Sequence, residues 1–212
     1  MKAEPASPPF VPHATYGLLA AIAAMFMVEL ATGRAGNETA LLALGALPNR
    51  PLNGEHWRLI SYSFLHRSWN HLLMNSALLW WTGRIVERRT GAARMLGVYF
   101  ASVLLAGLAI AIPSHHHPRE GESVGASGGV FGLLAAALIL AYRKDAVASF
   151  GHDPRMRIGL WIAMAISLYS TFQPGVSVAG HAGGLVAGLL LGLLIRIRRG
   201  EGSLEQRAGQ PA

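Results

Sequence analysis

The chain has 212 residues, of which 52% are hydrophobic and 14% are charged, and it contains no cysteine. A soluble domain usually carries about a quarter charged residues, so this composition excludes a soluble globular protein and favours an integral membrane protein. The absence of cysteine excludes disulfides and thiolate chemistry. The formal net charge of +7 could indicate a nucleic-acid-binding protein, but the positions of the basic residues argue against that class.

Six stretches of mostly apolar residues are long enough to cross a bilayer as helices. In chain order these predicted spans are 15–32, 69–86, 93–112, 125–142, 157–173 and 178–195. We interpret the first as a retained span rather than a signal peptide, because its apolar run is long and no A-x-A cleavage site follows it cleanly. The sequence therefore predicts an all-α membrane protein with a six-helix domain over 15–197. Polar, disordered cytoplasmic tails are expected at 1–14 and 198–212.

The basic residues indicate how these helices are oriented in the membrane. Twelve of the 18 Lys and Arg residues flank the second loop, the fourth loop or the end of the last span. They are Arg84, Arg88, Arg89, Arg94, Arg143, Lys144, Arg155, Arg157, Arg196, Arg198, Arg199 and Arg207. The third loop has only Arg119, beside two glutamates, and the fifth has none. The positive-inside rule then puts both termini in the cytoplasm, and such a one-sided distribution removes the argument for a nucleic-acid partner.

Four polar side chains fall at a similar depth in the outer half of the predicted bundle. His71 and Asn75 lie early in the second span, Ser127 lies early in the fourth, and His181 lies early in the sixth. All three spans run from outside to inside. Polar side chains are costly in a bilayer, so these positions predict a functional site.

Glycines spaced by four predict that the fourth and sixth spans pack closely together. Small residues at this spacing let two helix backbones approach each other in lipid. Ser127 and His181 each stand just before such a ridge, so close packing would bring the hydroxyl near the imidazole. The glycines concerned are Gly128 and Gly132 in the fourth span and Gly184, Gly188 and Gly192 in the sixth.

A serine hydroxyl is a weak nucleophile until a base takes its proton, and His181 is the candidate base. The aspartates between the two residues, Asp145 and Asp153, fall in the fourth loop on the cytoplasmic side. The sequence therefore predicts a Ser–His dyad without the carboxylate of a triad. Spacing alone leaves Glu29 and Glu122 open as partners of the imidazole.

The remaining groups of such a site can also be assigned. An oxyanion needs hydrogen-bond donors, and the backbone N–H of Ser127 at the start of a helix is one candidate. His71 and Asn75 are separated by four residues and share one helix face, so they offer side-chain donors. Phe131 or Tyr169 could orient the imidazole by packing against it.

These residues resemble the motifs of the rhomboid intramembrane serine proteases, from about residue 55 to 192. The resemblance rests on motifs that follow one another in the family's order. They are Trp57-Arg58; His66, His71 and Asn75 in an H-x4-H-x3-N pattern; Leu79-Trp80-Trp81, Gly83 and Val86-Glu87; Gly125-Ala126-Ser127-Gly128 with Phe131 and Gly132; and His181, Gly184 and Gly188.

The resemblance implies a six-helix bundle with a water-accessible cavity that opens outward. It implies Ser127 as nucleophile, His181 as general base and acid, and Asn75, His71 and the Ser127 amide around the oxyanion. It implies no metal or cofactor, and substrates that are transmembrane segments of other proteins. Because a helix hides its carbonyls in hydrogen bonds, such a substrate must unwind locally. The six-helix form favours the inner membrane of a bacterium, with the site open to the periplasmic or extracellular side.

Supporting roles are expected for the further motif residues. Arg58 is expected to brace the first loop, and His66 is expected to hydrogen-bond to that loop. Glu87 is expected to bind arginine side chains, and Glu29 is expected to lie at the membrane interface. The other supporting residues are Gly125, Gly128, Phe131, Gly184 and Gly188.

Several other readings of these motifs remain open. Gly125 to Gly129 also fits the nucleophile elbow of soluble hydrolases, which requires a strand before the serine and an acid before the histidine. The run 115–117 is three histidines and could suggest a metal site, as could His66, His71 and His181 together. At the level of the whole protein, the alternatives are a non-catalytic rhomboid-like protein that binds membrane clients, as derlins do, and a small-molecule transporter.

Overall fold

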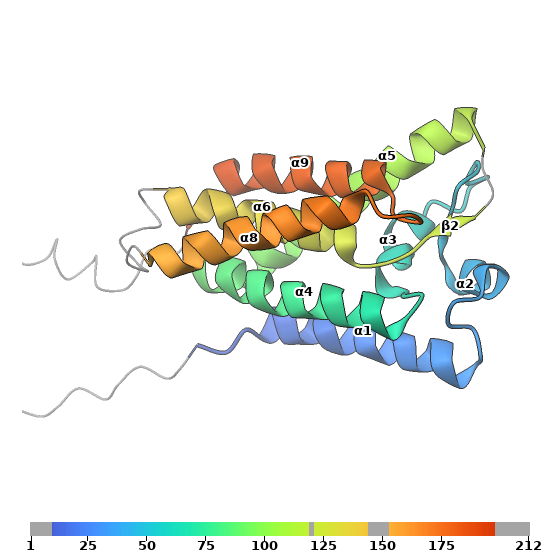
Figure 1. Ribbon diagram of the computed structural model, residues 1–212, viewed down its shortest axis with the longest axis horizontal. Coiled ribbons are helices and arrows are strands. Elements are labelled where there is room, and N and C mark those ends of the chain that lie inside the picture. Colours follow the sequence, from blue (N-terminus) through green and yellow to red (C-terminus); the bar gives the residue numbers. More distant parts are fainter. Residues whose placement is uncertain (1–9, 119–120, 144–152, 198–212) are drawn as a thin grey trace, which may run out of the picture.

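The computed structural model describes residues 10–118, 121–143 and 153–197. Within these ranges the chain is predominantly helical, and a helix occupies each of the six predicted segments (Figure 1). These helices are α1 (His13–Ala31), α4 (Trp69–Thr90), α5 (Ala92–His116), α6 (Ser127–Tyr142), α8 (Pro154–Thr171) and α9 (Val178–Leu194). The predicted tails lie mostly outside the described residues, although α1 already begins at His13, inside the tail predicted at 1–14.

Length and composition define two clear apolar spans among the described residues. They are α1, with 19 residues, and α5, with 25 residues. The helices α6 and α9 are equally apolar but shorter, at 16 and 17 residues. Each of the six helices nevertheless begins and ends within a few residues of its predicted bounds, because the apolar runs set their length.

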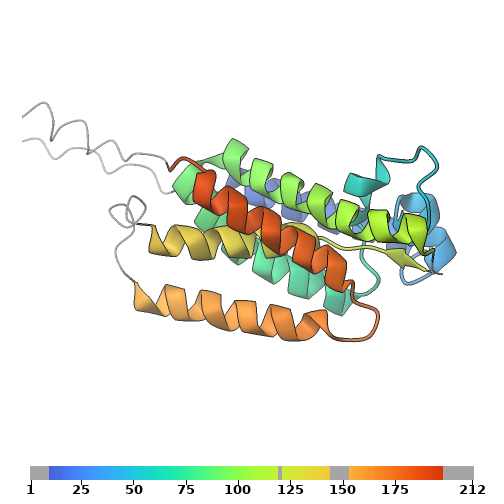
Figure 2. The same cartoon turned by 90° about the horizontal axis from the view of Figure 1, so that it is seen from above.

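The long helices lie side by side, and α6 is at the centre of the bundle (Figures 1 and 2). It contacts α4, α5, α8 and α9, and almost all of its residues are buried. A helix that is apolar on every side is expected in such a position. Figure 2 shows α8 along one edge of the bundle. The start of α1 and the end of α9 lie at the same end of the molecule (Figure 1).

The predicted contact between the glycine ridges of α6 and α9 is present. A methyl group added at Gly184 would lie 2.8 Å from the carbonyl carbon of Gly128, and one added at Gly188 would lie 2.5 Å from the Cα of Gly132. These distances leave no room for any side chain. The two backbones therefore touch directly, as small residues at this spacing allow.

The segment between α1 and α4 forms a small structure at one end of the bundle (Figure 1). It contains α2 (Glu38–Leu44), β1 (Leu47–Pro48), α3 (Arg58–Ser61) and a 3-10 turn at Tyr62–Phe64, and β1 pairs antiparallel with β2 (Glu122–Ser123). Arg58 Nη1 donates to the carbonyl oxygens of Leu42, at 2.6 Å, and Ala46, at 2.9 Å. Its guanidinium also pairs with Glu55 at 3.0 Å. Arg58 thus braces this loop.

Two glutamates make contacts that the sequence did not predict. Glu87 accepts from the backbone N–H groups of Ala14 and Thr15, at 3.0 and 2.9 Å, and from the Thr15 hydroxyl at 2.7 Å. It therefore caps the start of α1, where free N–H groups favour a negative charge. Glu29, near the end of α1, is fully buried, and its expected position at the membrane interface stays a prediction. Its carboxyl group accepts from the backbone N–H of His66, so this buried polar group is hydrogen-bonded.

Candidate active site

Ser127 and His181 are brought together by the close contact of α6 and α9. Ser127 is the first residue of α6, and His181 lies in the first turn of α9. The Ser177 hydroxyl caps that turn by accepting from the backbone N–H of Gly180 at 3.1 Å. The His181 Nε2 atom lies 2.9 Å from the Ser127 Oγ atom. This is a hydrogen-bond distance between a hydroxyl and a base.

The other side of the imidazole is held by α8 and by a ring from α6. The Nδ1 atom of His181 lies 2.8 Å from the Thr171 hydroxyl. The Phe131 ring stacks on the imidazole, with ring centroids 4.3 Å apart and planes at 24°. Tyr169, the other aromatic considered, is 73% exposed on the outside of α8. Thr171 is not among the residues predicted from the sequence, and the one available signal was its position at the outer end of the fifth predicted span.

The carboxylates that spacing left open do not approach His181. Glu29 is bound to the backbone of His66, and Glu122 pairs with Arg67 at 2.9 Å. Burial raises the pKa of Glu122, and the nearby Arg67 guanidinium opposes that shift. The nucleophile-elbow alternative requires an acid as the third group, and here the third group is a threonine.

The residue two positions before the serine must be a glycine. Gly125 has φ +120°, and a methyl group added there would lie 2.6 Å from the Nε2 and Cε1 atoms of the His71 imidazole. Its backbone N–H donates to the carbonyl oxygen of Tyr62 at 2.9 Å. The Tyr62 hydroxyl in turn donates to the carbonyl oxygen of Val103 at 2.9 Å. The first loop therefore fixes the backbone that leads into Ser127.

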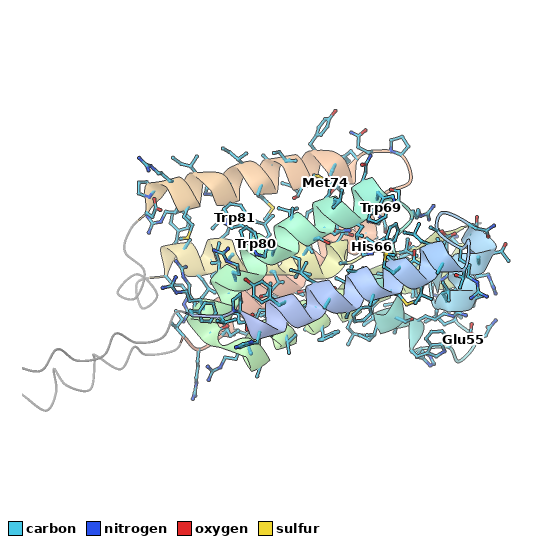
Figure 3. All side chains as sticks on the ribbon, turned by 90° about the horizontal axis from the view of Figure 1, so that it is seen from below. Glu55, His66, Trp69, Met74, Trp80 and Trp81 are labelled. Carbon is cyan, nitrogen blue, oxygen red and sulfur yellow. The ribbon has the colours of Figure 1, made fainter. Side chains whose placement is uncertain are left out.

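Asn75 and His66 form a buried pair beside His71. The Asn75 amide nitrogen lies 3.2 Å from His66 Nε2, and the two imidazole rings, at His66 and His71, have centroids 4.9 Å apart. Burial, reinforced by the neighbouring His71, lowers the pKa of His66 to about 3, so that ring is neutral and can accept from the amide. The Nε2 side of the His66 imidazole thus contacts α4, and its expected bond to the first loop stays a prediction. Figure 3 shows His66 and Trp69 at one end of α4 and Trp80 and Trp81 toward its other end.

These side chains line one cavity of about 670 Å³. Ser127, His181, Asn75 and His71 all contribute to its wall. One part of the cavity is polar, and it is lined by Arg67, Ser68, Asn70, Glu122 and Ser123. Another part lies between α4 and α8 and is mainly apolar, with Met74, Leu78, Trp81, Ile162, Ala163 and Ile166. The cavity therefore has polar lining residues in one part and apolar lining residues in another.

Such an arrangement suits acyl transfer. A hydroxyl in contact with an imidazole base can act as a nucleophile. The first N–H groups of α6 have no partner within their helix, and they carry the positive end of its dipole. An amide nitrogen has two N–H groups, so Asn75 can hold His66 with one and a ligand with the other. Donors placed around a developing oxyanion are the usual requirement of this chemistry.

The histidines considered as metal ligands do not form a ligand set. Within residues 10–118, 121–143 and 153–197, no three His, Asp or Glu side chains come together as the ligands of one metal ion would. The rings of His115 and His116 contact each other edge to face, with centroids 5.2 Å apart, at the end of α5 (Figure 1). Ser127 and His181 contact each other directly, a geometry that a zinc site at His181 would not explain.

Comparisons with known proteins show the family to which this chain belongs. The family model for the rhomboid domain matches residues 53–198, and the chain belongs to the rhomboid family of integral membrane proteins. Rhomboid protease GluP of Bacillus subtilis (strain 168) is 33% identical over 182 residues, which cover 84% of this chain and 34% of that protein. The putative rhomboid protease YdcA of the same organism is 34% identical over 142 residues, or 67% of this chain and 68% of that protein.

A plant relative extends the similarity beyond bacteria. RHOMBOID-like protein 4 of Arabidopsis thaliana is 35% identical over 158 residues, which cover 74% of this chain and 39% of that protein. The chain thus spans little more than a third of the length of this relative and of GluP. The range matched by the family model, residues 53–198, includes Ser127 and His181.

Proposed function

We propose that this protein is an intramembrane serine endopeptidase that cleaves transmembrane segments of other membrane proteins with a Ser–His dyad. The observation that carries the proposal is the 2.9 Å contact between Ser127 Oγ and His181 Nε2, at the wall of a cavity between helices. The names of the bacterial relatives, which are rhomboid proteases, support the same reaction class.

The reaction follows from the positions of these atoms. Ser127 Oγ attacks the scissile carbonyl carbon while His181 Nε2 takes its proton, and the carbonyl oxygen becomes an oxyanion. The N–H groups at the start of α6 and the amide of Asn75 stabilise that charge, with His71 as a further donor. The protonated imidazole then gives its proton to the leaving amine, and an acyl-enzyme forms. Water, deprotonated by the same nitrogen, hydrolyses the acyl-enzyme and restores the serine.

The six long helices are proposed to cross a bacterial inner membrane with both termini in the cytoplasm. Arginines gather at the helix ends that are remote from the dyad, where they bind free carbonyl oxygens. Arg143 Nη1 donates to the carbonyl oxygen of Ile195 at 2.7 Å, and Arg157 Nε donates to that of Ala141 at 3.1 Å. Basic residues mark the cytoplasmic side, so the dyad opens to the periplasmic or extracellular side.

The apolar side of the cavity supports a membrane-embedded substrate. Met74 on α4 and Ile162 and Ile166 on α8 line this side, and each is more than half exposed. Apolar side chains exposed at that depth face lipid, so a substrate helix can approach between α4 and α8 without crossing a polar surface. The polar part of the cavity provides the water that hydrolysis needs.

Cleavage of a tagged single-span protein in proteoliposomes tests this proposal. The full chain is compared with Ser127→Ala and with Ser114→Ala, whose hydroxyl bonds a helix carbonyl oxygen, that of Ile110, at 2.7 Å. We expect cleavage by the wild type and by Ser114→Ala and none by Ser127→Ala. Equal cleavage by all three proteins would overturn the nucleophile assignment. Stable binding of the substrate without cleavage by the wild type would indicate a client-binding rhomboid relative instead.

A further inference from the structure

Thr171 contacts the imidazole nitrogen that faces away from the serine. We propose that Thr171 is a positioning residue that holds His181 in the tautomer with its proton on Nδ1. This inference rests on the proposed function, because that tautomer is the one that leaves Nε2 free to take the serine proton. It adds a third member to a dyad that the sequence predicted to work without a carboxylate.

The proton on Nδ1 follows from the hydrogen bonds of the Thr171 hydroxyl. Its Oγ1 atom donates to the carbonyl oxygen of Ser167, one turn earlier in α8, at 2.9 Å. A hydroxyl has one proton and two lone pairs, so while it donates to Ser167 it accepts from His181, at 2.8 Å. In this arrangement the Nδ1 atom carries the hydrogen. Nε2 is then unprotonated and accepts from the Ser127 hydroxyl.

Burial of Thr171 and His181 strengthens the preference for one tautomer of the imidazole. Thr171 is 5% exposed and His181 is 9% exposed, so water competes weakly for either group. In the opposite tautomer the Thr171 hydroxyl would have to give up its bond to the Ser167 carbonyl oxygen in order to donate to Nδ1, 2.8 Å away, and the lost hydrogen bond disfavours that arrangement. The stacked Phe131 ring fixes the plane of the imidazole but does not select which nitrogen carries the proton.

A threonine also suits the surroundings better than the carboxylate of a triad. A charged third group would have to be desolvated between apolar helices, which is expensive. A neutral hydroxyl that is already bonded to its own helix loses little on burial. It orients the ring through one hydrogen bond and adds no charge next to the imidazole.

A second buried threonine, Thr82, provides a control that distinguishes a role at His181 from a role in helix packing. Thr82 is fully buried in α4 and donates to the carbonyl oxygen of Leu78 at 2.7 Å. It therefore makes the same bond within its helix as Thr171 but makes no contact with His181. Thr82→Val is the matched control for Thr171→Val, and Thr171→Ser restores the hydroxyl without the methyl group.

The test reads the tautomer directly. Proteins with ¹⁵N-labelled histidine are compared by NMR, and the His181 signals are identified by their loss in His181→Gln. We expect the Nδ1–H form in the wild type, in Thr171→Ser and in Thr82→Val. In Thr171→Val we expect a shift toward the Nε2–H form, because the hydrogen bond that selects the tautomer is gone. An Nε2–H tautomer in the wild type would overturn the proposal, even if Thr171→Val failed to fold.

A rate measurement on the same proteins completes the test. Labelling by a serine-directed fluorophosphonate should slow about tenfold in Thr171→Val, which corresponds to about 1.4 kcal/mol, the size of one hydrogen bond. Thr171→Ser and Thr82→Val should stay within about threefold of the wild type. An unchanged tautomer and rate in Thr171→Val would overturn the proposal, as would an equal loss in Thr171→Ser. If the wild type is not labelled at all, the proposed function fails, while the tautomer still decides the role of Thr171.

Discussion

Replacing Gly184 with alanine is expected to separate α9 from α6 and to weaken the contact between the serine and the histidine. The added methyl group would lie 2.8 Å from the carbonyl carbon and 3.0 Å from the Cα of Gly128, whereas ordinary contacts begin at 3.4 Å. Both neighbours are backbone atoms, so no side chain can turn away. The helices must therefore move apart by about 0.6 Å or more, and overpacking of this kind costs about 1–3 kcal/mol.

The same movement reaches the site, because Gly128 follows Ser127 directly and Gly184 lies one turn after His181. A separation of about 0.6 Å would lengthen the 2.9 Å contact beyond the hydrogen-bonding range. Since a misplacement of about 1 Å can cost about 10²-fold in rate, we expect labelling of Ser127 by a fluorophosphonate to slow at least about tenfold. Labelling rate and unfolding of the protein in mixed micelles are measured on the same samples.

Gly97→Ala is the matched control for this experiment. Gly97 lies in α5 and has no atom within 4 Å of the position that a methyl group would take. Alanine should there stabilise the helix by up to about 1 kcal/mol and leave the labelling rate unchanged. If Gly184→Ala unfolds like the wild type and labels within twofold of it, the reasoning from close backbone contact is refuted.

Three further predictions concern the cavity and the first loop. Asn75→Ala should lower kcat for cleavage by about 10²-fold, as loss of one oxyanion donor does, and an unchanged kcat would remove that assignment. Arg58→Ala should destabilise the protein by about 2–3 kcal/mol because it removes the donor to the buried carbonyl oxygen of Ala46 and to the part-buried one of Leu42; Arg58→Lys should recover only part of this in thermal unfolding. Burial lowers the pKa of His66 to about 3 in the folded protein, whereas the pKa of this imidazole in the unfolded chain is about 6.5. Below about pH 6.5 the unfolded chain therefore binds a proton that the folded protein does not bind, and the stability of the fold falls as the pH drops. Between pH 7.5 and 5.5 this loss is about 1.4 kcal/mol, and His66→Gln should show a correspondingly weaker pH dependence of unfolding.

The features that the sequence predicted best are those with a regular pattern. Apolar runs located the six long helices, and glycines at a spacing of four identified the contact between α6 and α9. That contact has a fixed register, so it also predicted that Ser127 and His181 would be close together. Each of these inferences depends on residues within one helix or on the depth of a helix in the membrane.

The contacts that the sequence did not predict join single residues across different elements. Thr171 meets His181 only because the chain turns between α8 and α9, and a lone threonine at a helix end carries no periodic signal. Glu87 caps a helix 72 residues earlier in the chain. The two-residue strands β1 and β2 pair over a similar separation. Positions of this kind depend on the packing of the whole bundle.

The most direct measurement is the identification of the residue that a serine-directed fluorophosphonate modifies in the membrane-reconstituted protein. After digestion, mass spectrometry should locate the adduct on Ser127 in the wild type and find none in Ser127→Ala or His181→Ala. An adduct on another serine, or equal modification of Ser127 when His181 is replaced by alanine, would contradict the assignment of this hydroxyl and this imidazole as nucleophile and base.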